Sequence, residues 1–193
     1  MVARERADAA RNRMRILDAA DELFARLDPT EVTMEGIAKA AGVGKGTLYR
    51  RYPTREAIAV ALLDEHERRL QEQLMTAAPP LGPGASPAAR MRAFYGAMVD
   101  LLDRHGHLAL AAETGAKRFS TGAYGFWRAH VGSLLDAAGL QRERAALVDT
   151  LLAPLAPEVF HQQSKVLGLG RNRIIAGLEL VADGVFAQAP QPR

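Results

Sequence analysis

The sequence predicts an all-α protein, and three of its features support this fold class. Apolar residues recur at the helical spacing of about 3.6 residues. No stretch shows the alternating, β-branched pattern that is typical of strands. Residues that commonly begin or end helices separate the periodic stretches. With 193 residues, 48% hydrophobic and 24% charged, the chain can form one large domain or two small ones.

The N-terminal part of the chain predicts four helices. They cover about residues 9–27, the stretch between Thr33 and Gly42, residues 44–52 and residues 54–76. Thr33 and Thr54 are suited to cap the second and fourth helices, and Gly42 is suited to close the second. Pro53 interrupts the chain after the third helix, because the residue before a proline avoids helical geometry.

A loop rich in proline and glycine, "TAAPPLGPGASP" at residues 76–87, separates these helices from the rest. Ser86-Pro87 then begins a new helix, with a capping serine followed by proline at the first helical position. The predicted helices of this second part are residues 87–105, 108–117, 122–138, 141–153, 157–167 and 171–187.

The chain contains no cysteine, so it has no disulfide framework and no thiolate metal site. Its N-terminus lacks the apolar core of a secretory signal, and no run of about 18 apolar residues could span a membrane. These features predict a cytoplasmic protein. The net charge of +3 says little about partners by itself.

The segment "AGVGKGTLYRRY", residues 41–52, admits two interpretations. A phosphate-binding loop of the form G-x-x-x-x-G-K would need a glycine at position 39 and a preceding strand. Position 39 holds Lys39, and the preceding residues have helical periodicity. Two short helices joined by a glycine-containing turn instead predict a helix-turn-helix, whose second helix enters the major groove of DNA.

The distribution of charge favours the same interpretation. Between Glu35 and Glu56 there are five basic residues and no acidic one, a local footprint for phosphate. They are Lys39, Lys45, Arg50, Arg51 and Arg55. The alternative is a plain helical hairpin with a solvated basic face.

The helical period sorts the residues of the third helix into faces. Lys45 and Tyr49 share one stripe, and Gly46 and Arg50 share the next. Thr47 and Arg51 flank these stripes, within reach of phosphates. Leu48 and Tyr52 fall on another face and are expected to pack on Ile37 and the first helix.

Residues 32–58, "VTMEGIAKAAGVGKGTLYRRYPTREAI", resemble the DNA-binding domain of the TetR family of bacterial transcriptional regulators, and "RILDAADELFARL" before them is similar too. The resemblance covers about residues 10–65. It implies that Thr33 and Arg55 contact phosphate and that Lys45 and Gly46 contact base edges. Together with the face analysis, the expected DNA-binding residues are Thr33, Lys45, Gly46, Thr47, Tyr49, Arg50, Arg51, Tyr52 and Arg55.

The segment departs from the usual family pattern in three places. Gly44 replaces a common serine, which removes a possible cap on the third helix. Arg50-Arg51 stands where histidine and a variable residue are frequent, and Tyr52 replaces a common phenylalanine. The arginine pair is expected to strengthen phosphate binding, and arginine reads guanine well. The operator sequence stays open.

The resemblance implies a homodimer whose larger helical domain binds a small molecule and dimerises. We expect residues 1–55 to form the DNA-binding domain and 56–193 the second domain, connected by the helix at about 54–76. The helix at 171–187 is apolar on more than one side, so it predicts a dimer interface with the helix at 141–153. The alternative is that it fills its own domain core.

Aromatic and polar residues of the second domain are candidates for a ligand pocket, although most aromatic residues at helical spacing belong to a core. The candidates are Phe94, Met98, His105, Phe119, Tyr124, Trp127 and His130. A metal site of His105, His107 and Glu113 is not expected, because the two histidines flank a predicted helix end and no fourth ligand has suitable spacing. No cofactor is expected either.

The sequence therefore predicts a homodimeric repressor of a palindromic double-stranded operator, released by a small-molecule effector. Activation in place of repression stays open. One alternative is a non-specific architectural DNA-binding protein, which the small net charge disfavours. The other is a helical enzyme, but no arrangement of nucleophile or paired acid and base points to a catalytic site.

Overall fold

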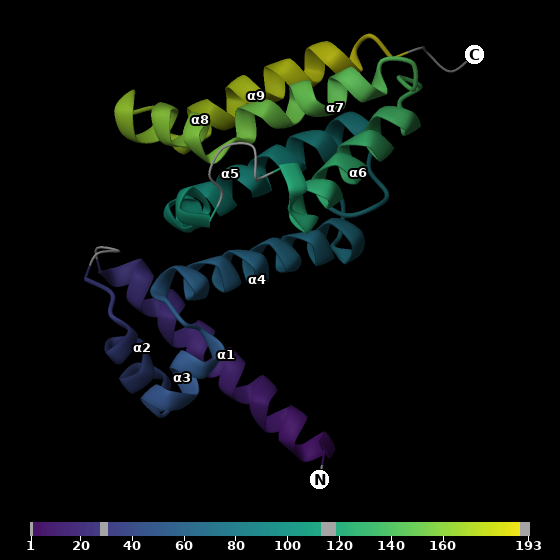
Figure 1. The fold of residues 1–193 in the computed structure, drawn as a ribbon. Coiled ribbons are helices and arrows are strands. Elements are labelled where there is room, and N and C mark those ends of the chain that lie inside the picture. Colours follow the sequence, from purple (N-terminus) through teal and green to yellow (C-terminus); the bar gives the residue numbers. More distant parts are fainter. Residues whose placement is uncertain (1, 28–30, 113–118, 190–193) are drawn as a thin grey trace. The chain divides into compact units, whose positions relative to one another are not determined.

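The computed structural model describes residues 2–27, 31–112 and 119–189, and every regular element in these ranges is a helix (Figure 1). The all-α fold class predicted from the sequence is confirmed. The chain divides into two compact units, Met1–Glu65 and His66–Arg193. None of the helices described is long and apolar enough to cross a membrane.

The N-terminal unit contains α1 (Val2–Arg26), α2 (Met34–Ala41), α3 (Lys45–Arg51) and the start of α4 (Arg55–Thr76). Its core is built from one buried face of each helix. The core includes Ile16, Leu17, Ala20, Phe24, Ile37, Ala38, Leu48, Ile58 and Leu62. These are the apolar positions that repeat at helical spacing, so burying one stripe of each helix gives the unit its shape.

The helix α1 begins at Val2, seven residues before the predicted start at residue 9. The prediction followed apolar periodicity, which begins only near Met14. The residues before it are mostly alanine, arginine and glutamate, which favour helix without needing a buried face. The helical propensity of these residues accounts for the earlier start.

The predicted ends of α2 are confirmed. The Thr33 hydroxyl accepts a hydrogen bond from the Gly36 amide at 3.0 Å. Gly42 has a left-handed backbone with φ of 62°, and the Val43 amide donates to the Ala38 carbonyl at 3.0 Å. This pattern closes a helix and turns the chain sharply, which places α3 directly after α2.

The C-terminal unit contains the rest of α4 and five further α-helices. They are α5 (Pro87–Ala112), α6 (Gly122–Ala137), α7 (Arg144–Leu152), α8 (Pro157–His161) and α9 (Arg171–Phe186). The long helix α5 packs against α6, α8 and α9. Its fully buried residues Phe94, Tyr95 and Val99 form the centre of this core. The Tyr95 hydroxyl donates to the Leu151 carbonyl at 3.0 Å, which joins α5 to α7.

The predicted break between the helices at 87–105 and 108–117 was wrong, since α5 runs through Gly106 to Ala112. A glycine inside a helix costs only about 1 kcal/mol relative to alanine. Packing on both sides of Gly106 compensates for this cost, because Leu102 and Leu108 are buried. Residues 113–117 of the predicted helix lie outside the described residues.

Two other boundaries differ from the prediction. Helix α7 begins at Arg144 rather than 141, because the three preceding residues form a turn after Gly139, whose φ is 80°. The predicted helix at 157–167 is α8 followed by a π-helical turn, Gln162–Val166. The hydrogen-bonding register thus changes where the sequence shows only continuous helical character.

Candidate DNA interface

The two faces of α3 differ sharply in burial. Leu48 is fully buried, and its neighbour Tyr49 is 47% exposed. Lys45, Arg50 and Arg51 are exposed as well. The helix therefore packs on its unit through Leu48 and exposes its tyrosine and cationic side chains to solvent, as the face analysis predicts.

Tyr52 lies on the inner side with Leu48. Only 7% of its surface is exposed, which agrees with the expected packing against the first two helices. The expectation that Tyr52 also contacts DNA does not fit this burial, because the ring is covered by its own unit. We therefore assign Tyr52 to the support of α3 rather than to the interface.

The turn between α2 and α3 is braced from α1. The Arg15 guanidinium donates to the Gly42 carbonyl at 3.1 Å. A Cβ atom added to Gly42 would lie 2.6 Å from Arg15 Nη2, and the positive φ would be strained with any side chain. The positive φ is therefore the reason for glycine at this position, because the flexible end of the Arg15 side chain could move away from an added Cβ atom.

Gly44 begins α3 without a side-chain cap, as expected from the loss of the common serine. Gly46 lies two residues further, and a Cβ atom added there would meet nothing within 4 Å. The isolated unit therefore gives no packing reason for glycine at position 46. A close approach of another molecule to the backbone would give one.

An ion pair between Lys45 and Glu35 was not foreseen from the sequence. The Lys45 ammonium donates to the Glu35 carboxylate, which raises the pKa of Lys45 through this hydrogen bond and through its charge. Glu35 lies in the first turn of α2, at the edge of the acid-free stretch. The tight turn at Gly42 brings the start of α2 beside the start of α3. Because this turn was predicted from the sequence, it could have indicated the ion pair.

Glu35→Gln is expected to strengthen DNA binding about twofold to fivefold at low salt, because this exposed ion pair must open before Lys45 reaches DNA. Fluorescence anisotropy with a labelled duplex measures the change. Glu31→Gln is the matched control, since it removes the same charge from an exposed site of the same unit. Equal effects of the two variants would contradict a specific role for the pair.

Thr33 and Arg55, two residues expected to contact phosphate, already have local partners. Thr33 caps α2, and at the start of α4 the Thr54 hydroxyl accepts from the Ala57 amide at 3.2 Å. The Arg55 guanidinium lies 3.3 Å from the Glu56 carboxylate. A hydrogen bond from its own backbone, a second one with Thr54 and the charge of Arg55 lower the pKa of Glu56.

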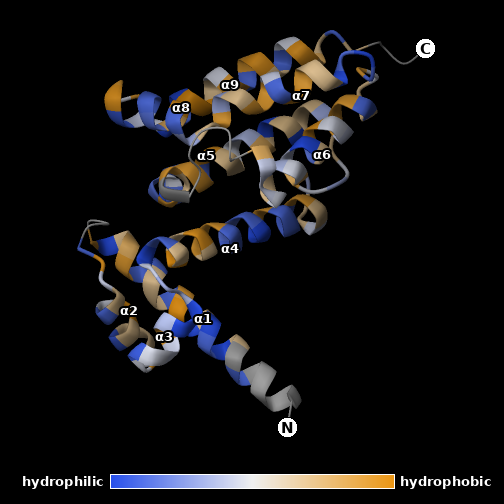
Figure 2. Ribbon diagram, in the orientation of Figure 1, coloured by the Kyte–Doolittle hydropathy of each residue, from blue (hydrophilic) through white to orange (hydrophobic). Residues whose placement is uncertain are grey.

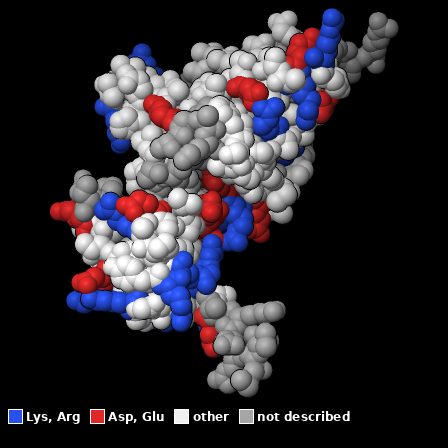
Figure 3. Space-filling model, in the orientation of Figure 1, with Lys and Arg blue, Asp and Glu red and all other residues white. Residues whose placement is uncertain are grey.

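Figure 3 shows Lys and Arg side chains gathered over the region where Figure 1 places α1 and α3.

The seven candidate ligand residues do not meet in one place. Phe94, Trp127 and His130 form a buried cluster, with ring centroids of Phe94 5.9 Å from Trp127 and 5.2 Å from His130. Met98 is buried on the same helix as Phe94. Burial, and then the charge of Arg90, lowers the pKa of His130 to about 4. Its Nε2 atom is buried without a hydrogen-bond partner.

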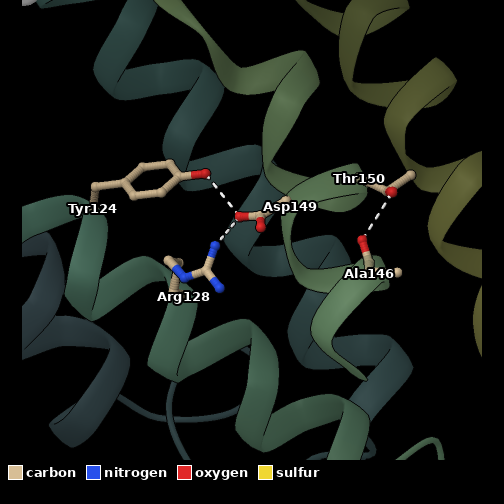
Figure 4. A network of polar contacts seen from close by, with 5 residues as sticks. All are labelled: Tyr124, Arg128, Ala146, Asp149 and Thr150. Carbon is tan, nitrogen blue, oxygen red and sulfur yellow. Dashed lines mark hydrogen bonds and ion pairs between the residues drawn. The ribbon is translucent and has the colours of Figure 1, made fainter. Parts of the chain in front are cut away.

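Tyr124 belongs to a second group, which joins α6 to α7 (Figure 4). Its hydroxyl donates to Asp149 at 3.0 Å, and the Arg128 guanidinium pairs with the same carboxylate oxygen. The hydrogen bond from Arg128 is the main reason why the pKa of Asp149 is lowered, and the hydrogen bond from Tyr124 lowers it further. Phe119, which is 55% exposed, packs edge-to-face on Tyr124 with centroids 5.1 Å apart. These contacts tie helices together.

His105 lies in a third place, where its ring stacks on His66 with centroids 3.6 Å apart. The other histidine considered for a metal, His107, is half-buried on the same helix α5, and Glu113 lies outside the described residues. Helical spacing alone could not separate these three groups, because it does not tell which neighbouring helix each side chain meets.

The geometry of the N-terminal unit defines a helix-turn-helix protein: α2 and α3 joined by a left-handed glycine turn, with a buried inner and an exposed cationic outer face. The model of bacterial regulatory proteins of the tetR family matches residues 16–62. The chain therefore resembles this family over its helix-turn-helix region.

Curated relatives agree with this assignment. An uncharacterised HTH-type transcriptional regulator of Mycobacterium tuberculosis is 48% identical over 61 residues, which are 32% of this chain and 30% of the relative. The match thus spans less than a third of that relative's length. The HTH-type regulator EthR of Mycolicibacterium smegmatis is 28% identical over 142 residues, or 72% of this chain and 64% of EthR.

Solved structures share the fold of nearly the whole chain. A TetR protein of Streptomyces coelicolor, SCO7222, has a TM-score of 0.65 at 20% identity, covering 91% of this chain and 98% of that one. FadR of Bacillus subtilis, crystallised with stearoyl-CoA, has a TM-score of 0.63 at 16% identity, covering 92% and 99%. These likenesses concern the fold.

Proposed function

We propose that the protein is a transcriptional regulator that binds a palindromic double-stranded operator as a homodimer, represses, and is released by a small-molecule effector. The observation that carries the proposal is the outward orientation of Lys45, Tyr49 and Arg50 on α3, opposite the buried Leu48. In this proposal α3 enters the major groove, and Thr33, Thr47, Arg51 and Arg55 contact the phosphates on either side. The protein acts in the cytoplasm.

In this proposal Lys45, Gly46 and Arg50 contact the base edges, and Tyr49 contacts either bases or phosphates. Arginine reads the O6 and N7 atoms of guanine with two hydrogen bonds, so Arg50 is suited to a guanine in each half-site. Two α3 helices related by a two-fold axis reach successive major grooves about 34 Å apart or somewhat more. This symmetry explains why the operator is expected to be palindromic.

Titration of a palindromic fragment from the promoter next to the gene tests the proposal. We expect sequence-specific binding with two protomers per site, and release by the effector. Binding with no sequence preference would favour the alternative of an architectural DNA-binding protein. The net charge of +3 argues against that alternative, since non-specific binding depends on many phosphate contacts.

The dimer is proposed to form through α7 and α9. Leu180 and Val181 on α9 are 74% and 46% exposed, and Figure 2 shows hydrophobic residues along this helix. Cβ atoms added to Gly177 and Gly184 would meet nothing within 4 Å, so this face of α9 is uncovered. Leu180, Val181 and Leu147 of α7 line an open groove. Such a face, with small residues beside a large one, suits close packing against a second copy.

Leu180→Asp is expected to raise the dissociation constant of the dimer at least about tenfold, because each copy loses a buried leucine and would bury a charge. Analytical ultracentrifugation measures the change. Leu167→Asp is the matched control, since Leu167 is 61% exposed directly after the π-helical turn and does not line this groove. A dimer that Leu180→Asp leaves intact would contradict this interface.

The effector is proposed to bind in the C-terminal unit and to favour the state that does not bind DNA, by about 1–3 kcal/mol of coupling. The capture of stearoyl-CoA by FadR, which has the same fold, supports ligand control. Residues 1–55 then serve as the DNA-binding domain and 56–193 as the ligand-binding and dimerisation domain. Helix α4 starts in the N-terminal unit and ends in the C-terminal one, so it is suited to transmit the change.

A further inference from the structure

A cavity of about 370 Å³ opens between the C-terminal part of α4 and the middle of α5, beside the loop that joins them. This volume falls in the range of small-molecule sites, which begins at about 300 Å³. All of its lining residues belong to the C-terminal unit. It does not contain Phe94, Trp127 or His130, so it is distinct from the buried aromatic cluster.

The cavity is lined by cationic groups on both sides. Arg69 comes from α4 and Arg104 from α5. Asp100 is the one carboxylate among the described residues that line it, and its Oδ1 atom lies 2.6 Å from Nη1 of Arg171 on α9. This ion pair offsets much of the charge of Asp100, so the carboxylate opposes an anion less strongly than an unpaired one would.

Hydrogen-bond donors lie on the same two helices. His66 of α4 and His105 of α5 both line the cavity, and their rings stack with an interplanar angle of 17°. Gln73, one turn beyond Arg69, adds an amide. Arginine guanidinium groups bind carboxylate and phosphate oxygens through paired hydrogen bonds, so this set of side chains suits an anionic group.

The remaining wall is apolar. It consists of Leu70, Leu81, Ala97 and Leu101. A bare inorganic ion would leave this surface in contact with water, whereas an aliphatic or aromatic group attached to the anion would cover it. The cavity thus combines an anion-binding side with a hydrophobic side.

We propose that this cavity binds an organic anion whose carboxylate or phosphate pairs with Arg69 and Arg104, while its apolar part lies against Leu70, Leu81 and Leu101. Binding itself does not depend on the proposed regulatory function. That such an anion is the effector rests on that function, since it requires that occupancy of the cavity change the affinity for DNA.

Isothermal titration calorimetry on the full chain, in low-salt buffer without phosphate or carboxylate, tests the site. The probes are octanoate, phenyl phosphate, inorganic phosphate and the neutral analogue octanamide. We expect octanoate or phenyl phosphate to bind, inorganic phosphate to bind at least tenfold more weakly than the organic anion, and octanamide not to bind. The preferred organic probe distinguishes a carboxylate from a phosphate ligand.

Arg104→Gln and Arg69→Gln are expected to weaken the organic anion at least tenfold each, and Arg104→Lys is expected to restore part of the loss. Lys165→Gln removes one charge from an exposed site elsewhere in the unit and should change nothing. Both arginines are exposed, so the variants should fold, which circular dichroism checks. Unchanged affinity in both glutamine variants, equal binding of octanamide, or no binding of either organic anion would overturn the proposal.

DNA binding is measured separately, without probes. Loss of anion binding in Arg104→Gln with intact DNA binding supports the cavity as a site of its own. A protein that binds the anion but no DNA retains this site and refutes the proposed function. A protein that binds DNA but neither organic anion refutes this site alone.

Discussion

Leu48→Ala is expected to lower the free energy of unfolding by about 2–5 kcal/mol, while Tyr49→Ala, one residue further, is expected to change it by less than about 0.5 kcal/mol. Leu48 is fully buried, so its truncation leaves a cavity between α3 and the rest of the N-terminal unit. Tyr49 is 47% exposed and loses little packing. Urea unfolding followed by circular dichroism measures both effects.

The effects on DNA binding are expected in the reverse order. At a temperature where both variants are folded, Tyr49→Ala should weaken operator binding at least about tenfold, since it loses one contact in each half-site. Leu48→Ala should bind with near-normal affinity once the folded fraction is accounted for. Tyr49→Phe serves as the control that keeps the ring. A Tyr49→Ala protein that is unstable but binds DNA normally would show that the faces of α3 are assigned wrongly.

The unfolding free energy should fall by about 2 kcal/mol between pH 8 and pH 5 through His130 alone. Burial lowers its pKa from 6.5 to about 4 in the folded protein. Between these two values the unfolded chain binds a proton that the folded chain does not, so stability rises with pH in this range. The contribution is fully present above about pH 6.5 and is lost as the pH falls toward 4.

His130→Leu isolates this contribution, because other groups also titrate in the same range. Leucine is apolar and suits a site beside Phe94 and Trp127, where the Nε2 atom of His130 has no hydrogen-bond partner. The variant should be at least as stable as the wild type at pH 5, and the difference between the two proteins should shrink at pH 8. Parallel pH curves for both proteins would contradict the burial of a neutral imidazole.

From α2 to the start of α4, the N-terminal unit could be predicted from the sequence almost residue by residue. Thr33, Gly42 and Pro53 are local signals, and each acts within one turn of the chain. The faces of α3 follow from the helical period alone. The Lys45–Glu35 ion pair and the contact of Arg15 with Gly42 were missed, because both join residues more than one turn apart in sequence.

The C-terminal unit could be predicted only as a set of helices. Gly106 was read as a helix end, yet α5 passes through it because its neighbours are held by α8 and α9. The candidate ligand residues separated into three groups for the same reason. Which side of a helix meets which partner depends on packing between distant segments, and helical periodicity carries no information about that choice.

Selection of binding sites from random duplexes tests the role of α3 most directly. The full chain and a variant with Lys45→Ala, Tyr49→Ala and Arg50→Ala are compared under the same salt. We predict that the wild type enriches a palindrome with half-sites about one helical turn or somewhat more apart, and that the variant loses this motif while keeping its fold. Enrichment of the same motif by both proteins would contradict DNA reading by the outer face of α3.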